Sequence, residues 1–220
     1  MLPRLYPILD RAFIAPAEAS EADRLNAIVL LVKAWSAAGV RFLQYRNKTG
    51  NEREMLADAR EIVRVLHSLG HRSETILIMN DRADLCLAAE FDGVHLGQDD
   101  LSPAAVRHVL ASVPQPRIIG VSCHNAAQIE AADADSEVDY LAIGPVFATS
   151  SKLNPDPVIG LTGLTAIRKL TSKPLVAIGG ITRANCGSVI HAGADSVAVI
   201  SDLYCGDPAK SVADFHSILG

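Results

Sequence analysis

Eight short apolar runs, rich in β-branched residues, recur along the whole 220-residue chain. Each run is bounded by Gly, Asp, Asn or Pro, as expected for strands that are covered on both faces. Most of the intervening segments carry apolar residues at helical spacing. The sequence therefore predicts strands at residues 5–9, 40–45, 76–79, 93–96, 118–122, 140–143, 175–178 and 196–200, and helices at residues 21–38, 51–69, 82–90, 125–134, 161–170, 182–192 and 208–219, with a further helix opening at Ser102 and Pro103.

This alternation favours an α/β fold, a single (β/α)8 TIM barrel that forms one domain over residues 1–220. The competing architecture is an open, doubly wound sheet. No Gly-x-Gly-x-x-Gly motif follows the first strand, and polar residues follow nearly every strand. A barrel gathers those strand ends into one site, whereas an open sheet spreads them along a crevice. The longest loop, residues 144–160, is rich in Ser, Pro and Asn and has the length of a binding loop.

The charge balance limits the class of partner. Lys and Arg number 20 against 25 Asp and Glu, which gives a formal charge of −5. We therefore expect no nucleic-acid partner, although a small anionic ligand remains compatible with this charge. No signal peptide and no apolar run of about 18 residues is visible, so we expect a cytoplasmic protein with no membrane segment. The sequence leaves open whether the chain forms a homo-oligomer.

The second predicted strand ends with cationic and amide side chains. Gln44, Arg46 and Lys48 alternate there, so in an extended chain they share one face toward the barrel mouth. An amide, a guanidinium and an ammonium group that converge in this way suit a phosphate or diphosphate. The alternative is a solvated strand end with outward-pointing charges.

Carboxylates follow the third and fourth predicted strands. Asp81 comes after Asn80, and Asp100 closes the run that begins at His95. Two carboxylates on neighbouring loops can hold Mg²⁺, which prefers oxygen ligands and bridges to substrate phosphates. The alternative is that each Asp only caps the helix that follows it. We expect His95 to pack below the site and not to act as a base.

The remaining strand ends predict a second anion site. Gly180 follows the seventh strand and Ser201 the eighth, where this barrel commonly binds phosphate through backbone N–H groups. Ser122 lies at the end of the fifth strand and could donate to a ligand. Cys123 and His124 are adjacent, so they would rarely face each other as a nucleophile and its base. Two anion sites and one metal site at one mouth suggest a reaction that joins a diphosphate substrate to a phosphate substrate.

Together, these motifs resemble those of the thiamine phosphate synthase family. They occur in the family's order and are spread over about the whole chain. The run at residues 92–100 and the end of the second strand are together the most specific. The matching segments are residues 44–48, 80–81, 92–100, 120–122, 144–147, 178–181 and 199–201.

The resemblance implies a Mg²⁺-dependent transferase on a TIM barrel. Its small-molecule substrates would be 4-amino-2-methyl-5-hydroxymethylpyrimidine diphosphate and 4-methyl-5-(2-hydroxyethyl)thiazole phosphate. Diphosphate would leave toward Mg²⁺ and the cationic side chains, and the thiazole nitrogen would attack the resulting pyrimidine-methyl cation. Carried over by position, Gln44, Arg46, Lys48, Asn80, Ser122 and Lys152 would bind the pyrimidine substrate, Asp81 and Asp100 the metal, and Thr149, Ser151, Gly180, Ile200 and Ser201 the thiazole phosphate. Of these, Arg46, Lys48, Ser122 and Lys152 would be catalytic.

The chain departs from the family pattern in one loop, where Ala148 stands in place of a usual Pro and Ser151 in place of a Thr. Three alternatives stay open. A thiazole tautomerase on the same barrel would lack the paired carboxylates and the basic strand end. A non-catalytic phosphate-ligand-binding relative would not need them. An unrelated barrel isomerase or lyase would want an acid/base pair in the mouth.

Overall fold

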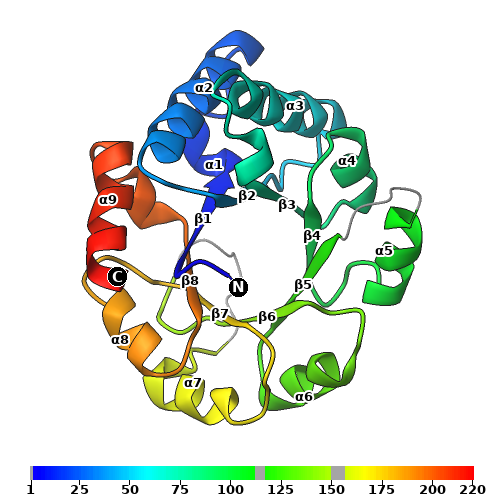
Figure 1. Ribbon diagram of the computed structural model, residues 1–220, viewed down its shortest axis with the longest axis vertical. Coiled ribbons are helices and arrows are strands. Elements are labelled where there is room, and N and C mark those ends of the chain that lie inside the picture. Colours follow the sequence, from blue (N-terminus) through cyan, green and yellow to red (C-terminus); the bar gives the residue numbers. More distant parts are fainter. Residues whose placement is uncertain (1, 112–116, 150–156) are drawn as a thin grey trace.

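Across the described residues 2–111, 117–149 and 157–220, a computed structural model shows eight parallel strands closed into a barrel (Figure 1). Each strand pairs with the next, and the last pairs with the first. The predicted TIM barrel is confirmed, and each predicted strand is present with ends that shift by two residues at most. The strands are β1 (Leu5–Asp10), β2 (Phe42–Arg46), β3 (Ile76–Asn80), β4 (Gly93–Leu96), β5 (Ile118–Cys123), β6 (Tyr140–Ile143), β7 (Leu175–Ile178) and β8 (Ser196–Val199).

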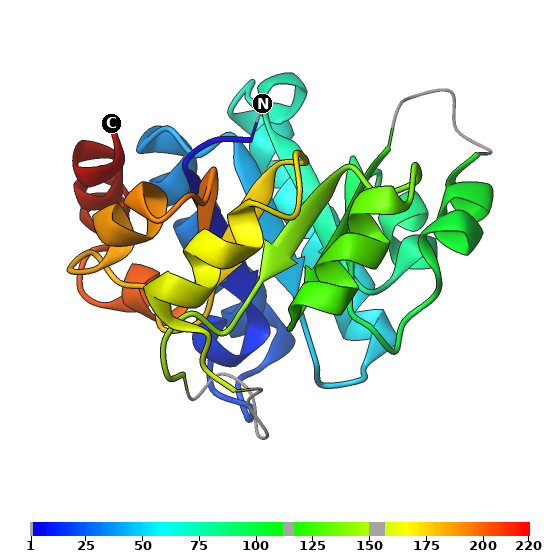
Figure 2. The ribbon, with the colours of Figure 1, turned by 90° about the horizontal axis from the view of Figure 1, so that it is seen from below.

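Helices surround the barrel and cover the outer face of its strands (Figures 1 and 2). In Figure 2 the carboxyl ends of the strands face the lower edge, opposite the N terminus. The helices are α1 (Arg11–Ile14), α2 (Glu21–Ala37), α3 (Glu52–Ser68), α4 (Ala83–Ala88), α5 (Pro103–Leu110), α6 (Ala126–Ala134), α7 (Gly160–Arg168), α8 (Cys186–His191) and α9 (Pro208–Leu219), and the 3₁₀ turns are η1 (Arg72–Glu74) and η2 (Ser201–Tyr204).

Local hydrogen bonds explain where the helices begin and end. The Ser102 hydroxyl accepts the Ala105 N–H at 3.3 Å, so this residue caps α5 as predicted. α8 begins later than predicted because the Asn185 side chain accepts the Thr182 N–H at 2.8 Å and holds the preceding residues in a turn. α4 is shorter than predicted, and Glu90, two residues after its end, has a φ of 57° that no helix tolerates. The sequence did not predict α1, since four residues are too few to show a helical period.

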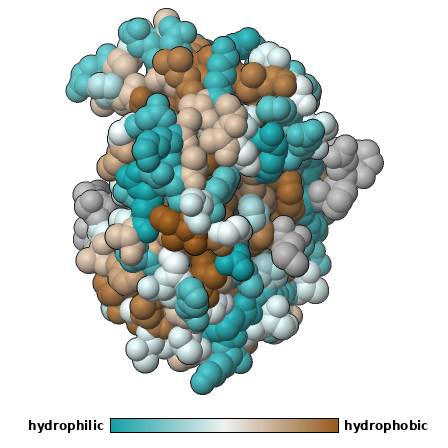
Figure 3. All heavy atoms as spheres, turned by 60° about the vertical axis from the view of Figure 1, so that its left-hand side comes forward, coloured by the Kyte–Doolittle hydropathy of each residue, from teal (hydrophilic) through white to brown (hydrophobic). Residues whose placement is uncertain are grey.

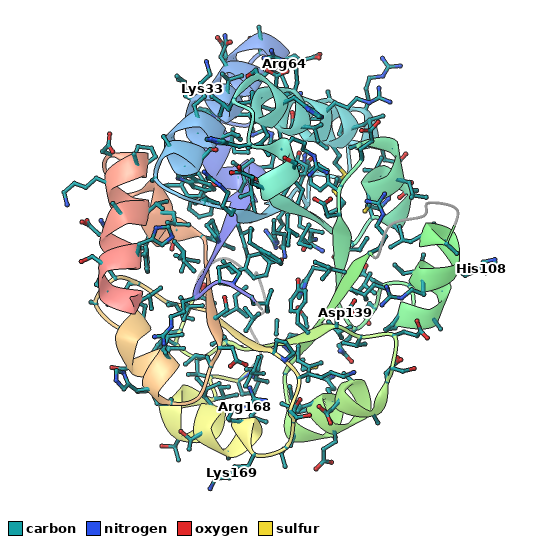
Figure 4. The ribbon with its side chains drawn as sticks, viewed as in Figure 1. Lys33, Arg64, His108, Asp139, Arg168 and Lys169 are labelled. Atoms are coloured by element: carbon teal, nitrogen blue, oxygen red, sulfur yellow. The ribbon has the colours of Figure 1, made fainter. Side chains whose placement is uncertain are left out.

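The strands carry apolar side chains on both faces, which produces two apolar layers. Side chains that point outward pack beneath the helices, and those that point inward fill the barrel. On the face seen in Figure 3, hydrophilic and hydrophobic residues are interspersed. No helix in the described part of the chain is long and apolar enough to cross a membrane. The interior layer contains Tyr6, Ile8, Phe42, Ile78, Tyr140, Ala142, Val176 and Ala198. Figure 4 shows Lys33, Arg64 and His108 on the outer helices and Lys169 at the end of α7, all away from the barrel axis.

One glycine makes room for a tyrosine ring of the interior layer. A Cβ atom on Gly120 would lie 2.0 Å from Cζ of Tyr140, so no larger residue fits beside that ring. Tyr140 itself is fully buried. Gly120 therefore fixes where the Tyr140 hydroxyl lies, directly beneath the barrel mouth.

We expect Gly120→Ala to lower the free energy of unfolding by about 2–3 kcal/mol, because the new methyl group must displace a packed ring. Gly187→Ala is the matched control, since its Cβ would meet Ile218 at an ordinary 3.7 Å. Replacing this helical glycine should raise the free energy of unfolding by about 0.5–1 kcal/mol. Urea unfolding measures both changes. A Gly120→Ala variant as stable as the wild type would contradict this packing.

Candidate active site

A cavity of about 460 Å³ opens at the carboxyl ends of the strands. It brings together most of the side chains that the sequence singled out, from the ends of seven different strands and the loops that follow them. Ser151 and Lys152 lie outside the described residues. The predicted residues that line the cavity are Gln44, Arg46, Lys48, Asn80, Asp81, Asp100, Ser122, Thr149, Gly180, Ile200 and Ser201.

The basic end of β2 faces the cavity, as the alternation predicts. Lys48 donates to Asp81 Oδ2 at 2.5 Å. Arg46 is paired with Asp10, a buried carboxylate that also caps α1 through the Ala12 N–H at 3.0 Å. Sequence reasoning missed Asp10, although it stands beside Arg46 in the register of β1 and β2. Its position directly after a strand, like that of Asp81, is the signal that could have identified it.

The backbone conformation of Asp81 directs its carboxylate toward the cavity. Its φ of 64° lies in the left-handed region, which Asp tolerates better than most residues. Its N–H donates to the His95 carbonyl at 2.8 Å, and this bond holds the bend at the strand end. Next to it, Asn80 Nδ2 is buried with no hydrogen-bond partner among the described residues. This orphaned donor lines the cavity, where a ligand oxygen could satisfy it.

Asp81 and Asp100 form a pair of carboxylates on neighbouring loops. Burial raises the pKa of Asp81, the Lys48 ammonium group opposes that rise, and the Asp100 carboxylate adds to it. The Gly97 N–H fixes Asp100 by donating to Oδ2 at 2.7 Å. Over the ranges that the structure describes, no cluster of three or more His, Cys, Asp or Glu side chains could hold a metal ion. Two adjacent carboxylates fit Mg²⁺, which completes its shell with waters and substrate oxygens.

His95 lies beneath the site, as expected. Its Nε2 bonds Ser122 Oγ at 2.8 Å and its Nδ1 bonds the Tyr140 hydroxyl at 2.9 Å. Burial lowers the pKa of His95 to about 4, so the ring is neutral at neutral pH. Gln98 donates to the Ser122 carbonyl at 2.6 Å and fixes the backbone of the same residue. Ser122 is thereby held at the cavity wall from two sides.

The opposite wall of the cavity is built from closely packed backbone. Gly180 has a φ of 63°, and a Cβ atom there would lie 2.5 Å from the Ala148 carbonyl oxygen. Asn185 donates to the Gly180 carbonyl at 3.0 Å and secures this turn. Ser201 begins η2, one residue after the end of β8. Backbone N–H groups at such turns suit a phosphate.

The adjacent Cys123 and His124 do not form a nucleophilic pair. Burial raises the pKa of the Cys123 thiol to about 11, so the thiolate is scarce at neutral pH. His124 Nδ1 lies 3.1 Å from the Gly144 carbonyl oxygen. This geometry agrees with the sequence argument against covalent catalysis.

The family model described as thiamine monophosphate synthase matches residues 12–203 of the chain. The chain belongs to this family. The matched range includes every predicted site residue from Gln44 to Ser201, whereas Tyr6 and Ile8, which also line the cavity, precede it.

Relatives and solved structures agree with the family model. A thiamine-phosphate synthase of Koribacter versatilis (strain Ellin345) is 54% identical over 218 residues, 99% of this chain and 96% of the relative. One from Chloroflexus aurantiacus is 41% identical over 183 residues, 83% of this chain and 81% of the relative. The structure of a thiamine phosphate pyrophosphorylase from Pyrococcus furiosus is similar with a TM-score of 0.79 and 28% identity, covering 98% of this chain and 95% of that one.

Burial of a neutral His95 makes the stability of this family member depend on pH. Its folded-state pKa of about 4 lies below the ordinary 6.5, so the unfolded chain binds a proton that the folded chain excludes. Stability contributed by this residue is therefore lost as the pH falls from 6.5 toward 4. Between pH 7 and pH 5 we expect His95→Gln to lose about 2 kcal/mol less stability than the wild type. Urea unfolding at both pH values measures this; equal losses would contradict a neutral, buried imidazole.

Proposed function

We propose that the protein is a thiamine-phosphate synthase. It joins 4-amino-2-methyl-5-hydroxymethylpyrimidine diphosphate to 4-methyl-5-(2-hydroxyethyl)thiazole phosphate and releases thiamine phosphate and diphosphate. The observation that carries this proposal is the single cavity with cationic and carboxylate side chains on one wall and a close-packed glycine turn on the other. One wall suits a diphosphate with its metal ion, and the other suits a phosphate.

In this proposal the end of β2 binds the diphosphate of the pyrimidine substrate. Arg46 and Lys48 neutralise its charge, and Asn80 supplies its orphaned amide donor. Gln44 and Ser122 contact the pyrimidine ring deeper in the cavity, and we assign Lys152 to the same substrate. Asp10 pairs with Arg46 and Asp81 pairs with Lys48, so both cations are held at the cavity where the diphosphate would bind.

Asp81 and Asp100 are the residues that would hold Mg²⁺. When bound, the metal ion supplies a positive charge that offsets the charge developing on the departing diphosphate. Burial raises the pKa of Asp81, and the neighbouring Asp100 carboxylate adds to that rise, so a divalent cation between the two would offset both effects. Lys48 lies against this pair and links it to the diphosphate site.

Thr149, Ser151, Gly180, Ile200 and Ser201 would bind the thiazole phosphate on the other wall. Once diphosphate has left, the thiazole nitrogen attacks the resulting pyrimidine-methyl cation. The chain needs no nucleophile of its own for this reaction, in agreement with the buried, protonated Cys123. Its contribution is to position two substrates and to stabilise a leaving anion. We further propose a cytoplasmic location, which the four free cysteines support.

Incubation of the purified protein with both substrates and Mg²⁺ tests the function directly. We expect thiamine phosphate and diphosphate to accumulate in equal amounts, and neither to form when one substrate is omitted. Absence of thiamine phosphate under these conditions would refute the proposal. Conversion of the thiazole phosphate alone to an isomer would favour a tautomerase.

We expect Asp81→Asn and Asp100→Asn each to lower kcat at least 100-fold at limiting Mg²⁺, because one of two anionic ligands is lost. Asn is the suitable replacement, since it tolerates the left-handed backbone at residue 81. Asp84→Asn removes the same charge from a carboxylate paired with Arg82 outside the cavity, and it should keep normal turnover. Initial rates over a Mg²⁺ titration provide the measurement. Normal rates in both site variants at limiting Mg²⁺ would exclude these metal ligands.

We expect Gly180→Ala to raise the half-saturating concentration of the thiazole phosphate at least tenfold, because the methyl group pushes the turn off the Ala148 carbonyl. The value for the pyrimidine diphosphate should change little. Gly206→Ala is the control for backbone strain, since residue 206 also has a positive φ of 86° but an open environment. Steady-state kinetics with each substrate varied separately decide the matter. An unchanged half-saturating concentration of the thiazole phosphate would show that its phosphate does not bind at the Gly180 turn.

A further inference from the structure

We propose that Tyr6, Tyr140 and His95 are positioning residues that turn the Ser122 hydroxyl into a hydrogen-bond donor toward a ring nitrogen of the pyrimidine substrate. The proposal rests on the proposed function for the identity of that ligand. The structural basis of the proposal is a continuous series of hydrogen bonds, called here the hydrogen-bond chain, that crosses the barrel beneath the cavity.

The hydrogen-bond chain joins five side chains from five strands. Gln44 Nε2 donates to the Tyr6 hydroxyl at 2.8 Å, and the Tyr6 and Tyr140 hydroxyls lie 2.9 Å apart. The Tyr140 hydroxyl bonds His95 Nδ1 at 2.9 Å, and His95 Nε2 bonds Ser122 Oγ at 2.8 Å. Gln44, Tyr6, Tyr140 and His95 are all buried, and Ser122, at the end of the chain, is partly exposed at the cavity.

Hydrogen bonding gives this chain a single direction. The Gln44 amide nitrogen can only donate, so the Tyr6 oxygen accepts and its own hydrogen passes to Tyr140. The Tyr140 hydrogen then passes to His95 Nδ1. A neutral imidazole that accepts at Nδ1 carries its hydrogen on Nε2 and donates it to Ser122. The Ser122 oxygen is thereby engaged as an acceptor, and its own hydrogen remains for a partner in the cavity.

Packing prevents any one link from rearranging alone. The Tyr140 ring fills the space beside Gly120, and the His95 ring stacks on it with centroids 5.5 Å apart. The Tyr6 ring stands edge-on to Phe42 at 4.7 Å. Among the residues that the structure describes, neither tyrosine hydroxyl has a hydrogen-bond partner outside this series of bonds, so reversing one bond would require reversing all of them.

The direction of the chain matches the chemistry of an aminopyrimidine. Its ring nitrogens are acceptors, so a hydroxyl of Ser122 that donates complements them. If the hydrogen-bond chain ran in the reverse direction, a lone pair of the Ser122 oxygen would face the lone pair of the ring nitrogen. A site whose buried polar groups are fixed in advance discriminates strongly against a ligand that lacks the matching atom. The hydrogen-bond chain thus selects a pyrimidine that carries a ring nitrogen opposite the Ser122 hydroxyl.

Tyr140→Phe and Tyr6→Phe test the proposal, because each removes one oxygen and keeps the ring. We expect either variant to bind the pyrimidine diphosphate about tenfold more weakly, with no change in the half-saturating concentration of the thiazole phosphate. Tyr45→Phe is the matched control: Tyr45 is equally buried, but its hydroxyl donates to Asp58 at 2.7 Å, away from the cavity. Thermal unfolding verifies that each variant is folded.

A deaza analogue with C–H in place of the contacted ring nitrogen separates positioning from general structural damage. Wild type and Tyr140→Phe should bind this analogue equally, so that the tenfold difference disappears. A tenfold difference that persists with every deaza analogue, or Tyr variants that bind the natural pyrimidine like wild type, would overturn the proposal.

Nitrogen-15 NMR of His95 tests the direction of the chain without any substrate. We expect the hydrogen on Nε2 in the wild-type protein; a hydrogen on Nδ1 would mean the reverse direction and would overturn the proposal. A protein with the Nε2–H form that fails to bind the pyrimidine diphosphate would overturn the proposed function instead. The two failures are therefore distinguishable.

Discussion

Pairing of β8 with β1 is the constraint on which the rest of the structure depends. Leu5, Tyr6 and Pro7 stand opposite Val197, Ala198 and Val199 in this last parallel pair. Closure turns an open row of strand ends into a ring, so that residues more than 100 positions apart share one cavity. It also places Tyr6 of the first strand within hydrogen-bond distance of Tyr140 of the sixth. Both the mouth and the layer beneath it exist because the sheet has no edges.

Opposite charges at the mouth balance one another before any substrate binds. Arg46 and Lys48 would repel each other in an empty cavity, but each has a carboxylate partner on a neighbouring strand or loop. An incoming diphosphate and its metal ion bring charges of both signs and can exchange with these partners. The charged groups that would stabilise the leaving group are thus already in position before it binds.

The sequence predicted the elements that have a clear period or a clear boundary. Strand ends rich in Gly, Asp and Asn located the mouth, and the alternation of Gln44, Arg46 and Lys48 placed three side chains on its wall. The strands are apolar on both faces, however, and such a pattern does not reveal which residues point inward. Nothing in the sequence therefore distinguishes Tyr6 and Tyr140 from ordinary core residues. The contact between them depends on closure of the barrel. Asp10 was missed because its role follows from the register with Arg46 in β2, which no local pattern contains.

The most direct test of the account is a crystal structure grown with Mn²⁺, in place of Mg²⁺, and inorganic diphosphate. We expect an anomalous peak from a metal ion that is bonded to carboxylate oxygens of both Asp81 and Asp100 at about 2.1 Å. Diphosphate oxygens should complete the metal shell and also contact Arg46 and Lys48. A metal ion bound elsewhere, or a diphosphate outside the cavity, would contradict the account.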